Sequence, residues 1–193
     1  SNGAKLHIDG ARIFNAAAAL DTPVSELTAE ADTVTFCLSK GLCAPVGSVI
    51  VGSRETIERA RKIRKSLGGG MRQGGILAAA GLIALREMTT RLKDDHANAR
   101  TLAEGIATIP YLSVDLARVK TNMVFFDLAP DAPMEPEALL DVLRNQYQIR
   151  MNIYGGRPRA IRAGTHYYVT REQVGRPIHA LAAARHVPAG RPS

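Results

Sequence analysis

Short apolar runs alternate with polar, glycine-containing breaks along the first third of the chain. Strands are predicted at residues 6–8, 33–38 and 46–51, because these runs are short and largely apolar and the second is β-branched and aromatic. An alanine-rich stretch at 11–20 is helix-prone and separates the first two runs. No short hairpin turn joins them, so the pattern favours a mostly parallel or mixed sheet with its functional groups at strand ends.

Two longer helices are predicted next. The first covers residues 54–67, with Ser53 as a plausible N-cap and three consecutive glycines, residues 68–70, as its stop. The second is expected at about 75–107. Its first half is apolar nearly all round and its second half is charged on several faces, which is typical of a helix that passes from a buried to an exposed setting.

The remaining residues are expected to form a compact α+β unit. Strands are predicted at 112–114, 122–128, 149–152 and 160–163, and helices at 137–147 and from Thr170 onward, before a frayed tail at 188–193. Thr170 and Gln173 form a capping-box pattern. Gly175 and Pro177 conflict with a helix interior, so we expect a delayed start or a kink there.

The fold class is therefore α/β, with two domains. Residues 1–88 are interpreted as the C-terminal part of a large domain and residues 89–193 as a small α+β domain, linked by the helix at about 75–107. The chain opens directly on a strand that ends in an acid, which is typical of the middle of an α/β domain.

Composition and charge narrow the functional classes. No apolar run is long enough to span a bilayer and no signal-peptide order is visible, so we expect a cytoplasmic protein. Cys37 and Cys43 match neither a zinc nor a redox motif, so they are interpreted as reduced thiols and no metal is expected. The net charge is +7, but only residues 59–65 are densely basic. A solvated helix face is therefore favoured over nucleic-acid binding.

Three side chains have the chemistry and the setting for a pyridoxal-phosphate (PLP) site. Asp9 ends a strand and offers a carboxylate to a ring nitrogen, and Lys40 follows a later strand and offers an amine for a Schiff base. Arg162, in a C-terminal strand, offers a guanidinium for a substrate carboxylate. A strand-end Asp is common in any fold, and a lysine before glycine also occurs as a surface residue or cap.

Three segments resemble signature stretches of the low-specificity L-threonine aldolase family, and two others match it more weakly. The stronger ones are LHIDGAR at 6–12, LSKGLCAPVGS at 38–48 and LGGGMRQ at 67–73; the weaker ones are TNMVFF at 121–126 and residues 162–166. The resemblance keeps its order over nearly the whole chain. It implies a fold-type-I PLP-dependent transferase-like fold and a homotetramer built from dimers with shared active sites.

The resemblance also implies roles for individual residues. Asp9 faces the pyridine nitrogen of PLP, Lys40 carries the cofactor as a Schiff base, and Arg12 with Arg162 orients the substrate carboxylate and nearby cofactor oxygens.

Two further cations flank the glycine run. By the same resemblance, Lys65 and Arg72 reach across a subunit interface towards the cofactor phosphate of a neighbour. Mobile backbone between flanking cations is a reasonable anion cradle.

The implied reaction is retro-aldol cleavage of a β-hydroxy-α-amino acid, giving glycine and acetaldehyde from L-threonine or L-allo-threonine. Cys43 departs from the family pattern, which usually has glycine there. We also expect the phosphate-binding turn and the ring-stacking histidine of the family's N-terminal half to be absent. His7 and His166 are interpreted as structural strand-end histidines.

Two other functions stay open. One is a different PLP enzyme on the same fold, such as a β-eliminating lyase or an aminotransferase, because fold and lysine do not fix the reaction. The other is a fragment without catalytic activity that serves as a dimerisation or basic binding module.

Overall fold

The computed structural model describes residues 3–184. The chain forms two compact units that divide between Lys93 and Asp94, and each is described by itself. The frayed tail predicted at 188–193 lies outside the described residues. Within residues 3–184, no helix combines the length and the apolar character needed to cross a membrane.

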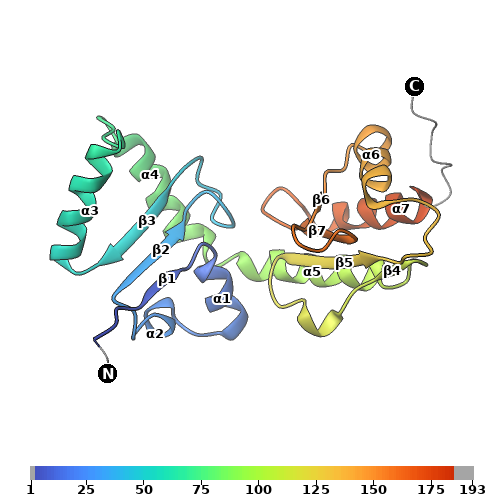
Figure 1. Cartoon of the computed structure of the whole chain (residues 1–193), viewed down its shortest axis with the longest axis horizontal. Helices are drawn as coiled ribbons and strands as arrows, with labels where there is room; N and C mark the ends of the chain where they lie inside the picture. Colours follow the sequence, from blue (N-terminus) through green and yellow to red (C-terminus); the bar gives the residue numbers. More distant parts are fainter. Residues whose placement is uncertain (1–2, 185–193) are drawn as a thin grey trace. The chain divides into compact units, whose positions relative to one another are not determined.

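The first unit is built on a three-stranded mixed sheet (Figure 1). Strand β2 (Thr33–Cys37) is central. It pairs in parallel with β1 (His7–Asp9) and antiparallel with β3 (Ser48–Gly52). The predicted mixed sheet is confirmed, with strand boundaries that move by one or two residues.

The helices of this unit are α1 (Ile13–Leu20), α2 (Val24–Leu27), α3 (Arg54–Ser66) and α4 (Gly75–Ile83). A π-helical turn, Ala84–Met88, follows α4, and α5 (Leu92–Ile106) begins after a turn at residues 89–91. The prediction of one unbroken helix at about 75–107 is therefore wrong. The hydroxyls of Thr89 and Thr90 donate to the carbonyls of Leu85 and Glu87, at 3.3 and 3.0 Å. Such side-chain bonds compete with the helical ladder.

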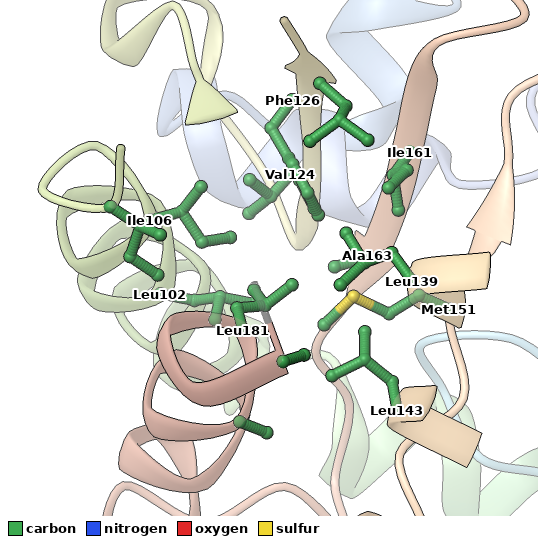
Figure 2. Packing of buried hydrophobic residues seen from close by; sticks show 14 of the residues in the cluster. Leu102, Ile106, Val124, Phe126, Leu139, Leu143, Met151, Ile161, Ala163 and Leu181 are labelled. Carbon is green, nitrogen blue, oxygen red and sulfur yellow. The ribbon is translucent and has the colours of Figure 1, made fainter. Parts of the chain in front are cut away.

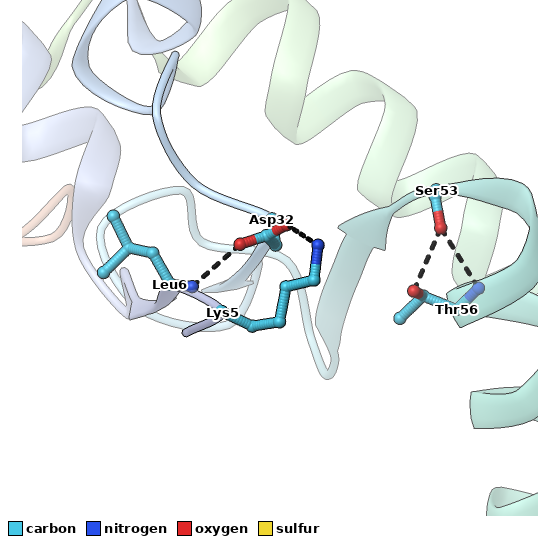
Figure 3. Close-up of polar contacts among 5 residues, drawn as sticks. All are labelled: Lys5, Leu6, Asp32, Ser53 and Thr56. Atoms are coloured by element: carbon cyan, nitrogen blue, oxygen red, sulfur yellow. Dashed lines mark hydrogen bonds and ion pairs between the residues drawn. The ribbon is translucent and has the colours of Figure 1, made fainter. Parts of the chain in front are cut away.

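Polar contacts fix the ends of three elements of this unit (Figure 3). Asp32 accepts hydrogen bonds from Lys5 Nζ at 2.9 Å and from the Leu6 backbone N–H at 2.8 Å, which ties the start of β1 to the start of β2. The bond from Lys5 is the main reason that the pKa of Asp32 lies below its usual value. Ser53 Oγ accepts from Thr56 N at 3.3 Å, which confirms the predicted N-cap of α3.

The second unit holds a four-stranded antiparallel sheet. The strand order is β4 (Leu112–Ser113), β5 (Met123–Leu128), β7 (Ala160–Gly164) and β6 (Asn152–Ile153). Helices α6 (Pro136–Tyr147) and α7 (Gly175–Ala184) join α5 in this unit, with short 3-10 turns at Leu116–Arg118 and Glu172–Val174. The predicted α+β unit is confirmed.

One strand boundary in this unit differs from the prediction, and one helix boundary agrees with it. The strand expected at 149–152 is only Asn152–Ile153, because Gln148 adopts a left-handed conformation and Ile149 N–H bonds to the Leu143 carbonyl at 3.0 Å, closing the end of α6. The last helix has the expected delayed start. Gln173 accepts from Thr170 N–H at 3.1 Å, and Pro177 stands in the first turn of α7, where proline is tolerated.

The core of the second unit lies on one face of its sheet (Figure 2). Val124, Phe126 and Leu128 of β5 are buried against apolar side chains of α5, α6 and α7. Alternate residues of a strand point to opposite faces, so Phe125 lies on the other face. Strand β7 pairs Phe125 with Arg162, which places Arg162 on that open face as well.

Candidate functional site

The carboxyl ends of β1 and β2 meet at one edge of the first sheet. Asp9 is the last residue of β1, is exposed, and pairs in parallel register with Thr35. Beyond it, Gly10 N–H donates to the Thr35 carbonyl at 2.8 Å, and Cys37 N–H donates to the Ala11 carbonyl at 3.4 Å. The segment after Asp9 therefore follows the end of β2, the strand that leads to Lys40.

Lys40 stands on a short loop whose backbone is tied at several points. Leu38 N–H donates to Gly47 O at 2.9 Å, Ala44 N–H donates to Leu38 O at 3.0 Å, and Cys43 N–H donates to Lys40 O at 3.0 Å. Leu38, Leu42 and Ala44 are buried in the core of the unit, whereas Lys40 is exposed. The fold thus presents an accessible amine on a fixed backbone.

Close packing constrains Gly41 and backbone conformation constrains Cys43, both in the loop that carries Lys40. A Cβ on Gly41 would stand 2.9 Å from Asn15 Oδ1 and 3.2 Å from Leu92 Cδ2, so only glycine fits without a shift. Cys43 has a φ of 58°, the left-handed region that glycine adopts most readily. Glycine, which the resemblance leads us to expect at this position, would adopt this conformation without steric cost.

Arg12 lies at the same sheet edge as Asp9 and Lys40. It caps the start of α1, and its carbonyl accepts from Asn15 N at 2.9 Å and Ala16 N at 3.2 Å. The fold therefore brings three of the predicted site residues to one edge.

Sequence reasoning overlooked Asn15, which is only 3% exposed and stands beside Gly41. A single asparagine in an otherwise alanine-rich helix was the available signal.

Lys65 and Arg72 lie on either side of the glycine run, and both are exposed. Gly68 has a φ of 81°, Gly68 N–H bonds to Lys65 O at 3.1 Å, and Gly69 N–H bonds to Arg64 O at 2.8 Å. This pair of backbone hydrogen bonds is a Schellman motif at the C-terminus of α3, so the predicted helix stop is confirmed. Within residues 3–184, the side chains of Lys65 and Arg72 make no hydrogen bond or ion pair, which leaves two cations available to an anion.

Arg162 belongs to the second unit and lies in the middle of β7, opposite Phe125 on one side and Asn152 on the other. Its side chain is exposed on the open face of the sheet.

The two histidines considered in the sequence have structural contacts. His7 Nδ1 lies 2.8 Å from Thr33 Oγ1, and His166 Nδ1 accepts from Tyr168 N–H at 3.3 Å. Across the described part of the chain, no group of three or more His, Cys, Asp or Glu side chains is arranged to hold a metal ion.

Comparison with protein families places this geometry in context. A family model for β-eliminating lyases matches residues 1–129. Low-specificity L-threonine aldolase 1 of Arabidopsis thaliana is 47% identical over 173 residues, which are 90% of this chain and 48% of that protein. The low specificity L-threonine aldolase of Escherichia coli K12 is 44% identical over 169 residues, 88% of this chain and 47% of that protein. The chain thus spans about half the length of these relatives.

Solved structures share the fold. A putative L-allo-threonine aldolase from Listeria monocytogenes superposes with a TM-score of 0.75 at 15% identity, covering 94% of this chain and 52% of that one. An alanine–glyoxylate aminotransferase from Nostoc superposes with a TM-score of 0.66 at 18% identity, covering 94% of this chain and 54% of that one. The expected α/β fold of the PLP-dependent transferase type is confirmed.

Proposed function

Because the chain belongs to the β-eliminating lyase family, we propose that it supplies the cofactor-anchoring part of a PLP-dependent threonine aldolase. Relatives at 44–57% identity carry the name low-specificity L-threonine aldolase, which supports this choice within the family. The substrate would be a β-hydroxy-α-amino acid, L-threonine or L-allo-threonine, and the products glycine and acetaldehyde. One observation carries the proposal: an exposed Lys40 on a tied loop, at the sheet edge where Asp9 also ends its strand.

The donor set at this edge fits PLP. An accessible amine on a fixed backbone suits covalent attachment of an aldehyde cofactor, so Lys40 is assigned that role. The Asp9 carboxylate, on the neighbouring parallel strand, is suited to face the pyridine nitrogen of PLP. There it would keep that nitrogen protonated. When bound, PLP supplies an electron sink for the pair released as the substrate Cα–Cβ bond breaks.

The remaining cations are assigned to anionic groups. Arg12 and Arg162 would bind the substrate carboxylate, because a guanidinium forms two parallel hydrogen bonds to it, and Arg12 would also approach cofactor oxygens. Lys65 and Arg72 would bind the cofactor phosphate of a neighbouring subunit, which is consistent with the exposure of the whole glycine run between them. Residues 1–88 would then be part of the PLP-binding large domain and residues 89–193 the small domain.

The assembly and compartment are proposed on similar grounds. A homotetramer with shared active sites would place the exposed Lys65 and Arg72 against a second subunit. Cys37 and Cys43 are both free thiols, and disulfides are rare in reducing compartments, so a cytoplasmic location is consistent with them.

A second candidate is another PLP enzyme of the same fold. The aminotransferase from Nostoc shares this fold with a TM-score of 0.66, so the fold alone does not select the reaction. Product analysis of a full-length protein containing this segment, with threonine, serine and tyrosine as substrates, separates the two. Acetaldehyde and glycine from threonine support the aldolase, whereas pyruvate from serine or phenol from tyrosine supports a β-eliminating lyase.

The anchor itself is tested on this chain by titration with PLP, borohydride reduction and peptide mapping. We expect the label on Lys40 and its loss in Lys40→Ala. Lys62→Ala is the matched control, because Lys62 is an exposed lysine of α3 with no assigned role. Selective labelling of another lysine would overturn the assignment of Lys40.

A further inference from the structure

A cavity of about 410 Å³ lies in the second unit, between the end of α6 with the segment that follows it and the start of α7. Its volume falls within the range of about 300–1,000 Å³ that is usual for small-molecule sites. Arg162 does not line it. Arg162 lies on the open face of the sheet, whereas the cavity is lined by Ala163, the next residue of β7, whose side chain is buried on the helical face.

The charge of the cavity wall is entirely positive. Among the described residues, Arg150 and Arg176 line it and no aspartate or glutamate does. Within residues 3–184, neither guanidinium makes a hydrogen bond or an ion pair. Two cations that share a cavity without a counterion favour an anionic ligand. The first turn of α7, which includes Arg176, adds the partial positive charge of a helix N-terminus.

Two polar residues of the wall have their acceptor atoms already occupied. His166 Nδ1 accepts from Tyr168 N–H at 3.3 Å, so a neutral ring carries its hydrogen on Nε2. Gln173 Oε1 accepts from Thr170 N–H at 3.1 Å, which leaves its amide NH₂ as a donor. Both side chains can therefore offer hydrogen-bond donors to a ligand, as an anion requires.

The floor of the cavity is apolar. Leu102, Met151 and Val174 line it and are all buried core residues. An inorganic ion would leave this surface without a partner, whereas an aliphatic group would cover it. We propose that this cavity binds a small organic carboxylate with an aliphatic tail, its carboxylate on Arg150 and Arg176 and its tail on the apolar floor.

The test is an NMR titration of this chain, following backbone amides with 4-methylpentanoate as the probe. We expect shifts at residues 148–151 and 164–177 that saturate. The neutral 4-methylpentanamide should leave these signals in place, and acetate should bind at least about tenfold more weakly because it lacks the tail. Equal affinity for acetate and 4-methylpentanoate, or equal shifts with the amide, would overturn the proposal.

Variants locate the binding. Arg150→Gln with Arg176→Gln should weaken binding about tenfold or more, because both charge-assisted contacts are lost. Arg171→Gln removes the same charge from an exposed position outside the cavity and should change the affinity less than about twofold. The two cavity arginines are exposed, so the variants should keep their melting temperature. An Arg171→Gln effect as large as that of the double variant would contradict the assignment.

Arg162→Gln separates this cavity from the proposed catalytic role of Arg162. Binding of 4-methylpentanoate should persist in that variant, since Arg162 lies on the opposite face of the sheet. Loss of the shifts in Arg162→Gln would mean that the probe occupies the open face. Binding of a carboxylate in this cavity does not require PLP, so its outcome is independent of the role of Lys40.

Discussion

Ile178 of α7 packs against the bare backbone of Gly105 in α5, and its Cγ1 carbon stands 2.7 Å from where a Cβ on Gly105 would be. Gly105→Ala should therefore destabilise the second unit. Overpacking costs about 1–3 kcal/mol and the better helix propensity of alanine returns about 1 kcal/mol, so we expect a net loss of up to about 2 kcal/mol. Urea unfolding measures it.

Gly175→Ala is the matched control, because no atom of residues 3–184 lies within 4 Å of where a Cβ on Gly175, at the start of α7, would stand. That variant should be neutral or slightly stabilised. Adding Ile178→Ala to Gly105→Ala should remove the steric part of the loss, and two independent, additive effects would contradict this account.

Phe126 and Phe125 are neighbours in β5 that face opposite sides of the sheet. Phe126 is 0% exposed in the core, so Phe126→Ala should cost about 3–5 kcal/mol of unfolding free energy. Phe125 is half-buried and makes an edge contact with Tyr154, with ring centroids 4.9 Å apart. Phe125→Ala should cost less than half as much, and similar urea midpoints for the two variants would mean that the assignment of faces is wrong.

Cys43 carries a left-handed backbone next to Lys40, with a φ of 58°. Cys43→Gly should relieve about 1 kcal/mol of backbone cost and leave the stability equal or higher. Cys43→Val places a β-branched side chain in that conformation and should lose about 1–2 kcal/mol. Thermal melts of the three proteins test the order Gly, Cys, Val. A valine variant as stable as the glycine variant would remove the backbone explanation.

Burial lowers the pKa of His96 below its ordinary value of 6.5, and the charge of Asp95 offsets part of this effect. The unfolded chain therefore takes up the proton first as the pH falls. Stability from this group is complete above about pH 6.5 and declines between that pH and the lowered pKa of the folded state. The urea midpoint between pH 8 and 5 should fall less steeply in His96→Gln than in the parent. Parallel curves would exclude His96 as the cause.

Local patterns predicted most of the elements, because capping residues, glycine stops and short apolar runs act over a few residues. Ser53 and Gly68 marked both ends of α3 correctly, and the conflict at Pro177 marked the late start of α7. The edge that joins Asp9 to Lys40 followed from strand ends once the sheet was taken as partly parallel.

What the sequence did not predict depends on contacts between distant residues. The π-turn at Ala84–Met88 and the cavity between Arg150 and Arg176 have no local signature. The same holds for Asn15, whose side chain matters through Gly41, twenty-six positions away in the chain and adjacent in space.

The three glycines after α3 are not interchangeable. Gly68 has a φ of 81°, and no atom of residues 3–184 lies within 4 Å of where an L-Cβ would stand, so its requirement is one of backbone handedness and an L-alanine would be strained there. Gly70 has no such φ, but a Cβ on it would stand 2.9 Å from Lys65 Nζ. An L-alanine at this position would displace the flexible end of the Lys65 side chain, which carries the ammonium group. The glycine run after α3 therefore contains one residue that the left-handed backbone requires and one residue against which a charged side chain packs.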